Sequence, residues 1–202
     1  LLLKQGTIVD ATIIDSVNRP LSDKKREQLE ADPSPQIDTD ANSTKKGSTY
    51  YFGYKGHIGV DTGSKLIRKI AFTPAAPHDS TVLEDLVSED ERSLFGDKAY
   101  DRDSLKQMAR DDGWYYGILD KGKRGDPLSS TQKKRNKRHQ QVRSQVEHPF
   151  ASIKDRYGLR WAKAKTKVRN KARFVMASIC WNIERGITWS KKQQHITPAR
   201  AT

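Results

Sequence analysis

Two aspartates and one glutamate stand where their types and settings could support chemistry. Asp10 interrupts a segment of apolar and β-branched residues, 7–14, that otherwise predicts a buried strand. Asp97 follows a short apolar segment and Gly96, at a predicted strand end, where ligands of α/β sheets usually bind. Glu147 lies in an amphipathic segment. Because aspartate is rare in strands and a lone carboxylate is costly to bury, Asp10 is the most unusual of the three.

Each of these carboxylates also has an ordinary explanation. Asp10 could pair with a basic residue or bond to a loop, and Asp97 could be a common strand-to-loop residue. Asp101 is a rival acidic candidate, but it falls in the following loop. Arg143, Glu147 and Lys154 lie within about 40° of one another on a helix, which would equally suit a surface row of ion pairs.

The three carboxylates become informative if the fold brings them together. Close carboxylates repel one another, and without a cation at least one of them would tend to take up a proton. Mg²⁺ resolves this conflict, because it favours a few carboxylates together with water and substrate phosphate. Two such ions, roughly 3.5–4 Å apart, can activate an attacking oxygen and stabilise a leaving one. Three convergent carboxylates would therefore suit phosphodiester chemistry.

The surroundings of these residues resemble the DDE triad of bacterial transposases of the insertion-sequence-4 and insertion-sequence-5 families, and most closely the latter. The matching segments are Val9–Thr12, Gly96–Tyr100, Val146–Phe150, Tyr51–His57 and Pro77–Ser80. The family signature reads Tyr, two residues, Arg, three residues, Glu, six residues, Lys. Arg143, Glu147 and Lys154 occupy those spacings, whereas Gln140 departs from the family at the Tyr position.

This resemblance implies a function and a fold. It implies that Asp10, Asp97 and Glu147 are the catalytic ligands of two Mg²⁺ or Mn²⁺ ions. The expected activity is DNA cleavage at transposon ends and strand transfer into target DNA, performed by a homodimer on double-stranded DNA. Alternatives are a nuclease without strand transfer and an inactive remnant that only binds DNA. The expected fold is an RNase H-like mixed five-stranded sheet flanked by helices, without the N-terminal region that helps relatives to recognise transposon ends.

Charge independently favours a nucleic-acid partner. The chain has 202 residues, a formal net charge of +13 and 31% charged residues, and excess of this size points to a polyanion. Lysines and arginines gather in two runs, and spaced basic residues suit phosphate contacts, although a solvated surface is the ordinary explanation. Trp161 could stack on an unpaired base or pack in the core. The candidates for DNA contact are Arg143, Lys154, Lys133, Lys134, Arg135, Lys137, Arg138, Arg160, Lys163 and Trp161.

The order of predicted elements fits one α/β domain over residues 1–187. Strands are predicted at 6–15, 50–61, 66–72, 93–95 and 114–119, and helices near 79–87, 103–110, 140–157 and 168–183. Residues 18–48 are expected to form an exposed loop with a short helix around 24–29, and residues 121–139 a basic connector. Pro149 should kink its helix or start a new turn. Residues 188–202 are expected to be a mobile polar tail.

The remaining sequence features limit the class of protein. A single cysteine, Cys180, cannot form an internal disulfide and suits a reducing compartment. No apolar stretch approaches the ~20 residues needed to cross a bilayer. A cytoplasmic protein, at the nucleoid when bound to DNA, is therefore expected. His57, His78 and His148 match no zinc spacing, so they are assigned structural or substrate-side roles.

Overall fold

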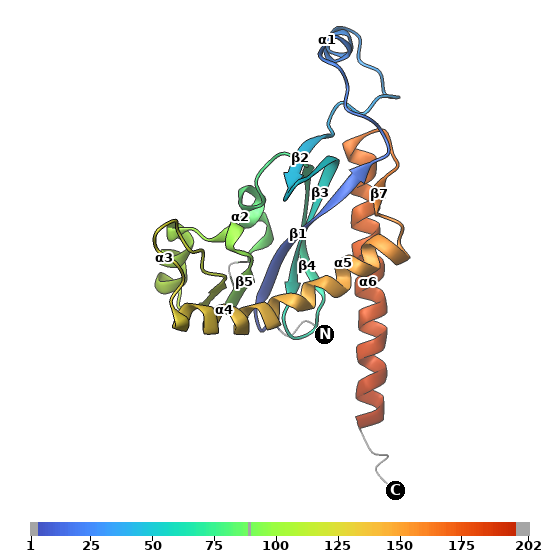
Figure 1. The fold of residues 1–202 in the computed structure, drawn as a ribbon. Coiled ribbons are helices and arrows are strands. Elements are labelled where there is room, and N and C mark those ends of the chain that lie inside the picture. Colours follow the sequence, from blue (N-terminus) through green and yellow to red (C-terminus); the bar gives the residue numbers. More distant parts are fainter. Residues whose placement is uncertain (1–3, 89, 197–202) are drawn as a thin grey trace, which may run out of the picture.

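The computed structural model describes residues 4–88 and 90–196, which form a mixed α/β fold (Figure 1). The main sheet has the strand order β2-β3-β1-β5-β6, and β4 and β7 pair with β3 and β1. Its strands are β1 (Thr7–Ser16), β2 (Asn42–Lys46), β3 (Thr49–Asp61), β4 (Ile67–Pro74), β5 (Ser93–Gly96), β6 (Tyr115–Ile118) and β7 (Trp161–Ala162). β1 runs antiparallel to β3 and parallel to β5, so the expected RNase H-like class is confirmed.

All five predicted strands are present, as β1, β3, β4, β5 and β6. The two additional strands are short. β2 lies inside the segment 18–48 that was expected to be a loop, and that part of the prediction is wrong. Because β2 consists only of polar residues, it lacks the alternation that predicts strands. It pairs with the start of β3 through a turn at Gly47, whose φ of +62° suits glycine.

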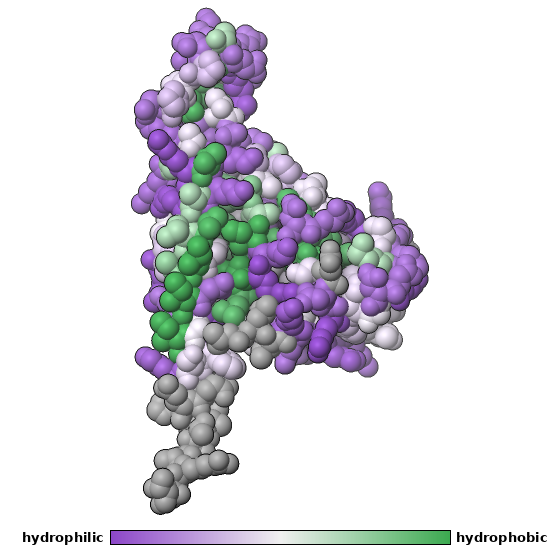
Figure 2. Space-filling model, turned by 180° about the vertical axis from the view of Figure 1, so that it is seen from behind, coloured by the Kyte–Doolittle hydropathy of each residue, from purple (hydrophilic) through white to green (hydrophobic). Residues whose placement is uncertain are grey.

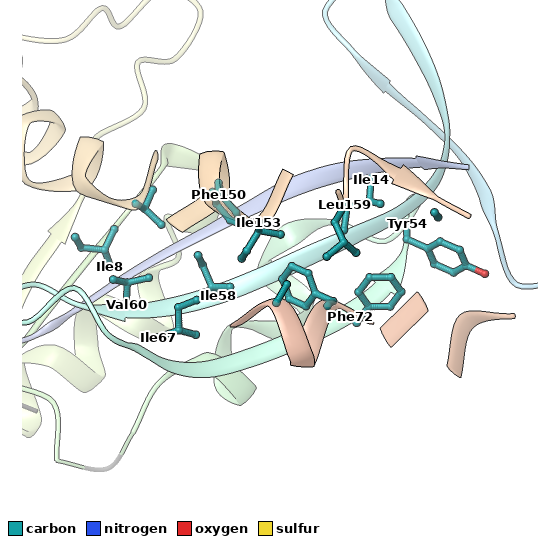
Figure 3. Close-up of a cluster of buried hydrophobic side chains, with 14 of the residues drawn as sticks. Ile8, Ile14, Tyr54, Ile58, Val60, Ile67, Phe72, Phe150, Ile153 and Leu159 are labelled. Carbon is teal, nitrogen blue, oxygen red and sulfur yellow. The ribbon is translucent and has the colours of Figure 1, made fainter. Parts of the chain in front are cut away.

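Both faces of the sheet carry an apolar core. On one face, Ile8 and Ile14 of β1 pack with Ile58 of β3 and with Phe150 and Ile153 of the overlying helices (Figure 3). The aromatic ring of Phe174 also joins this core. On the other face, Val9 of β1 joins a second core beneath the shorter helices. β1 is therefore covered on both sides, and Asp10 follows directly after two fully buried residues.

The shorter helices cover the second face and the β5–β6 edge of the sheet. They are α2 (Leu83–Leu86), preceded by the 3₁₀ turn η1 (Asp79–Val82), and α3 (Asp103–Asp111), preceded by the 3₁₀ turn η2 (Lys98–Tyr100). The helix α1 (Asp23–Ala31) projects away from the sheet (Figure 1). His78 caps η1, because its side chain accepts a hydrogen bond from the backbone N–H of Ser80.

A long helical segment crosses the first face of the sheet (Figure 1). It consists of α4 (Ser130–Arg143), the 3₁₀ turn η3 (Ser144–Val146), α5 (Glu147–Ala151) and the π-helical turn η4 (Ser152–Arg156). The expected basic connector is therefore helical from residue 130 onward. Ser129 and Gln132 form a capping box that starts α4. The chain stays helical through Pro149, whose missing N–H is accommodated between the 3₁₀ and π-helical turns.

The last helix, α6 (Lys167–Ile196), is longer than predicted. Residues 188–196 of the expected polar tail are helical, and residues 197–202 lie outside the described part of the chain. The outer side of α6 carries an exposed apolar stripe, which runs along the helix in Figure 2. Its members are Val168, Met176, Ile179, Ile183 and Ile187. Among the described residues, no helix is both long and apolar enough to cross a membrane.

Candidate active site

Asp10 lies where two neighbouring strands part. The parallel pairing between β1 and β5 ends at Ile8 and Phe95, two residues before Asp10. Asp97 follows the last residue of β5, at the same divergence. On its other edge, β1 stays paired with β3, where Asp10 faces Ile58. The sheet therefore holds Asp10 in a continuous strand and delivers Asp97 from the end of the adjacent one.

Both carboxylate oxygens of Asp10 have partners. Nη2 of Arg143 donates to Oδ2 at 3.1 Å, and the backbone N–H of Ala11 donates to Oδ1 at 2.8 Å. Burial nevertheless raises the pKa of Asp10 above its ordinary value, with a smaller upward contribution from the charge of Asp97, while Arg143 opposes the shift. The effect of Asp97 on this pKa places the two carboxylates within electrostatic reach of each other.

Asp97 is held by the turn that it starts. Its side chain accepts a hydrogen bond from the backbone N–H of Lys98 at 2.7 Å. Gly96 allows the close packing just before it, because an added Cβ would lie 2.9 Å from Ile118 and 3.0 Å from Val9. The rival Asp101 is engaged elsewhere: it accepts a hydrogen bond from the hydroxyl of Tyr116 at 2.8 Å.

A cavity of about 220 Å³, here the carboxylate cavity, brings these residues together. Its volume would hold about seven waters. It combines three carboxylates with four basic side chains. The lining residues are Asp10, Ala11, Ile13, Thr44, Lys45, Lys46, Lys55, Asp79, Asp97 and Arg143. Acidic and basic groups in one small cavity can bind a cation and a phosphate side by side.

Glu147 is exposed and does not line this cavity. It begins α5, four residues after Arg143 and directly after the 3₁₀ turn η3. Among the described residues, no group of three or more His, Cys, Asp or Glu side chains is arranged to hold a metal ion. The role of Glu147 as the third ligand stays a prediction.

The donor chemistry at Asp10 and Asp97 fits a hard divalent cation. Carboxylate oxygens are the ligands that Mg²⁺ and Mn²⁺ prefer. A cation between the two side chains would offset the burial, and the smaller repulsion by Asp97, that raise the pKa of Asp10. Such a cation and Arg143 would both contact the carboxylate of Asp10, because the guanidinium of Arg143 already contacts Oδ2. Asp10 and Asp97 are therefore the residues of this cavity best suited to hold a metal.

Comparison with known protein families agrees with this geometry. A family model described as the transposase DDE domain matches residues 2–183, which include every residue of the carboxylate cavity. The chain belongs to the DDE transposase family. Members of this family are phosphoryl-transfer enzymes that act on DNA and generally use divalent metals. The match covers the core of the transposase from the segment before β1 to the middle of α6.

The transposase has a second cavity of about 230 Å³ farther along β1, here the tryptophan cavity. Trp161 is 48% exposed, so it is not packed in the core. Burial, with Lys46 and Arg160, lowers the pKa of the half-buried Lys154, which indicates crowded positive charge. The lining residues are Thr12, Ile13, Asp15, Lys46, Tyr51, Lys154, Arg160 and Trp161. Lys46 lines both cavities, so they adjoin.

The other predicted DNA contacts lie mainly on α4. Lys133, Lys134, Lys137 and Arg138 are exposed there, and Lys163 is exposed just after β7. Arg135 differs from them, because its guanidinium is bound by the carboxylate of Asp120, with Nε 3.0 Å from Oδ2. The structure therefore separates four exposed cations of α4 from one that already has an acidic partner.

Four charged residues of the carboxylate cavity were not among the site residues predicted from the sequence. They are Lys45, Lys46, Lys55 and Asp79. A signal for two of them was present. Lys55 lies in the segment Tyr51–His57 and Asp79 in Pro77–Ser80, and both segments resemble the insertion-sequence-5 pattern. Their position beside Asp10 depends on the register of β3 and on the turn η1.

Proposed function

We propose that this transposase hydrolyses a phosphodiester bond at the ends of its transposon and then uses the freed 3′ hydroxyl to attack target DNA. The observation that carries the proposal is the meeting of Asp10 and Asp97 with Arg143 at the carboxylate cavity. Resemblance to the insertion-sequence-5 family supports the same chemistry. The segments that resemble that family include the ones that carry Lys55 and Asp79 into this cavity.

The roles of the site residues follow from their chemistry. Asp10 and Asp97, with Glu147 as a third ligand, would hold two Mg²⁺ or Mn²⁺ ions. When bound, such a pair supplies Lewis-acid stabilisation to the attacking and leaving oxygens of an in-line displacement. Arg143 offers a planar, permanently charged donor for a phosphate oxygen. Its present contact with Asp10 already keeps that donor at the cavity.

The basic surfaces beside the cavity would position DNA. The exposed cations of α4 suit phosphate contacts on one side. On the other side, Lys154, Arg160 and Trp161 combine positive charge with an exposed aromatic ring, a combination typical of sites for unpaired strands. We therefore propose that double-stranded DNA lies along α4 and that a frayed end reaches the tryptophan cavity.

We also propose that two copies assemble on DNA through α6. Met176, Ile179, Ile183 and Ile187 are spaced by three, four and four residues, which places them on one face of the helix. A second copy of the same helix would cover this stripe (Figure 2). Light scattering should give twice the chain mass for the wild type and the monomer mass for Ile183→Glu. A monomeric wild type on DNA would contradict the dimer.

The decisive test uses duplexes that carry the inverted repeats flanking the coding sequence. The wild type should nick them in Mg²⁺, and Asp97→Asn should abolish nicking and joining while leaving DNA affinity largely intact. The substitution removes a charged ligand but keeps the size of the side chain. Wild-type activity of Asp97→Asn would show that this triad assignment is wrong.

Two alternatives are separated by the same assays. A nuclease on this fold would nick DNA but fail to join a pre-cut end to target DNA. A remnant that only binds DNA would retain affinity without either activity. Activity that appears only after the upstream coding sequence is added would favour an enzyme that needs an N-terminal region over a decayed one.

A further inference from the structure

A third aspartate and a lysine form an ion pair in the carboxylate cavity. Nζ of Lys55 lies 2.8 Å from Oδ1 of Asp79, and it donates a hydrogen bond to the backbone carbonyl of Pro77, also at 2.8 Å. Lys55 belongs to β3, the strand paired with β1, where it faces Ile13. Asp79 begins the turn η1. Two elements that are distant in sequence therefore place one ammonium in the cavity that Asp10 and Asp97 also line.

This pair is unusually secluded for two charged groups. The side chain of Lys55 is only 11% exposed and that of Asp79 is 29% exposed. Removing such a pair from water is costly, and well-packed apolar side chains of similar size could often replace it without loss of stability. Charged groups retained in a cavity at such a cost are candidates for a functional role.

Tyr100 gives a second, independent sign that the cavity is built for a polar ligand. It is 1% exposed, and its hydroxyl has no hydrogen-bond partner among the described residues. Burial raises the pKa of Tyr100, and the charges of Asp79, Asp10 and Asp97 add to that shift. Tyr100 lies in the turn η2, which Asp97 starts. Buried hydroxyls normally have a partner, so this one is free to donate to a bound group.

We propose that Lys55 is a catalytic residue of the transposase, whose ammonium stabilises the negative charge that develops on the scissile phosphate. The inference rests on the proposed function. During hydrolysis, a water oxygen bonds to phosphorus and the bond from phosphorus to the 3′ oxygen breaks. Water loses one proton and the 3′ oxygen gains one, while Lys55 stays protonated. An ammonium has three donors; one is used by the carbonyl of Pro77 and Asp79 Oδ1 lies beside the group, so a donor remains for a phosphate oxygen.

Asp79 acts through Lys55 and is a positioning residue. Its carboxylate largely neutralises the ammonium in the ground state, so Lys55 adds little to the affinity for DNA. As the transition state gains negative charge, the fixed ammonium becomes more valuable. Lys55 should therefore contribute to the cleavage rate far more than to binding, which distinguishes it from an ordinary DNA-contacting lysine.

The first experiment measures single-turnover cleavage of the inverted-repeat duplex in Mg²⁺ and DNA affinity in EDTA. Lys55→Met should slow cleavage about a hundredfold, the usual effect of losing one such donor, with less than a threefold change in Kd. Lys55→Arg should restore part of the rate. Lys69→Met removes an exposed lysine of β4 and serves as the matched control, with no change in either quantity.

The second experiment uses Asp79→Asn, for which the two readouts should move in opposite directions. Cleavage should slow by about tenfold, because Lys55 loses its anchor, while Kd should fall slightly, because a negative charge leaves the DNA-facing cavity. A merely structural role would weaken binding and cleavage together. Circular dichroism melting checks that each variant is folded.

The outcomes separate this inference from the proposed function. If Asp97→Asn is inactive but Lys55→Met cuts at the wild-type rate, the inference fails and the proposed function stands. A loss of DNA affinity in Lys55→Met equal to its loss of rate would overturn the transition-state role. A wild-type chain that never cuts DNA would overturn both. Slow cleavage by Lys55→Met with unchanged affinity supports the inference.

Discussion

The carboxylate cavity and the tryptophan cavity lie along the same strand but differ in composition. The first sets three aspartates against four basic residues. The second sets one carboxylate, Asp15, against three basic residues and adds the aromatic rings of Tyr51 and Trp161. Lys46 lines both. Excess positive charge with exposed aromatic groups suits holding a strand, whereas balanced charges with carboxylates suit binding a metal beside a phosphate.

This difference assigns two tasks to the two halves of β1. Asp10 belongs to the half that performs chemistry, and Asp15 to the half that holds DNA. The helical segment from α4 to η4 spans both halves, because Arg143 reaches Asp10 and Lys154 lies near enough to Asp15 to influence its pKa. Changes in the first cavity should therefore affect rate, and changes in the second should affect affinity.

The largest loss of cleavage rate is expected for a substitution of Glu147, which lies between Arg143 and Lys154 in the sequence. Glu147→Gln should slow Mg²⁺-dependent cleavage by at least about a hundredfold, since a ligand of the metal pair supports several kcal/mol of transition-state stabilisation. Stability should change by less than about 0.5 kcal/mol, because the side chain is exposed.

Glu184→Gln is the matched control for that substitution. Glu184 accepts from Arg156 on the surface, at 2.7 Å, and lines neither cavity. It should leave cleavage unchanged. Equal activity of the Glu147 and Glu184 variants would mean that Glu147 takes no part in the chemical step.

The next effect is on the pH dependence of stability. Burial lowers the pKa of His57, which is 1% exposed and contacts the hydroxyl of Thr73, to about 4, against about 6.5 when unfolded. The unfolded chain therefore binds the proton more readily. The contribution of neutral His57 to the free energy of unfolding is complete above pH 6.5. It is lost as the pH falls toward 4, and the total loss is about 3 kcal/mol.

Urea unfolding of the wild type and His57→Gln at pH 7 and pH 4.5 measures this contribution. The variant should lose clearly less stability between the two values than the wild type does. Equal losses would mean that His57 is not a buried neutral group.

A smaller effect is expected in the second cavity. Trp161→Ala should weaken binding of a duplex with a frayed end by about tenfold, since stacking on an aromatic ring contributes about 1–3 kcal/mol per base. The cleavage rate at saturating DNA should stay the same. Fluorescence anisotropy gives the affinity. Tyr50→Ala removes an aromatic residue that is 73% exposed but lines neither cavity, and it should change affinity little.

A fall in the saturated rate of Trp161→Ala, without a loss of affinity, would break the division between the two cavities. It would mean that Trp161 takes part in the chemical step. The same duplex without the frayed end provides a second reference, on which Trp161→Ala should bind nearly as the wild type does.

The five main strands could be predicted, and Asp10 and Asp97 could be selected as candidates, because the sequence patterns that indicate them are local. Asp10 is conspicuous within its apolar segment, and Asp97 follows a strand end and a glycine. Residues 130–139 of α4 were missed because they are polar on every side and show no apolar period. Its start was nevertheless encoded, since Ser129 and Gln132 have capping-box spacing.

Contacts between distant segments could not be predicted in the same way. Lys55 and Asp79 are 24 residues apart, and they meet because β4 pairs with β3, where Lys55 faces Thr73, and the chain after β4 turns back through η1. The partner of Asp10 was also open, since a basic neighbour was one of the ordinary explanations. Arg143 proves to be that neighbour, but it lies in the same cavity as Asp97 rather than apart from it.

We expect Asp10, Asp97 and Glu147 to share a metal site. A crystal structure with Mn²⁺, measured by anomalous scattering, tests this directly. The expected result is a peak bound by oxygens of Asp10 and Asp97 at about 2.0–2.3 Å, with Glu147 turned inward to the same site. A peak elsewhere, or a Glu147 carboxylate that stays more than ~10 Å from the other two, beyond the span of a metal pair, would contradict it.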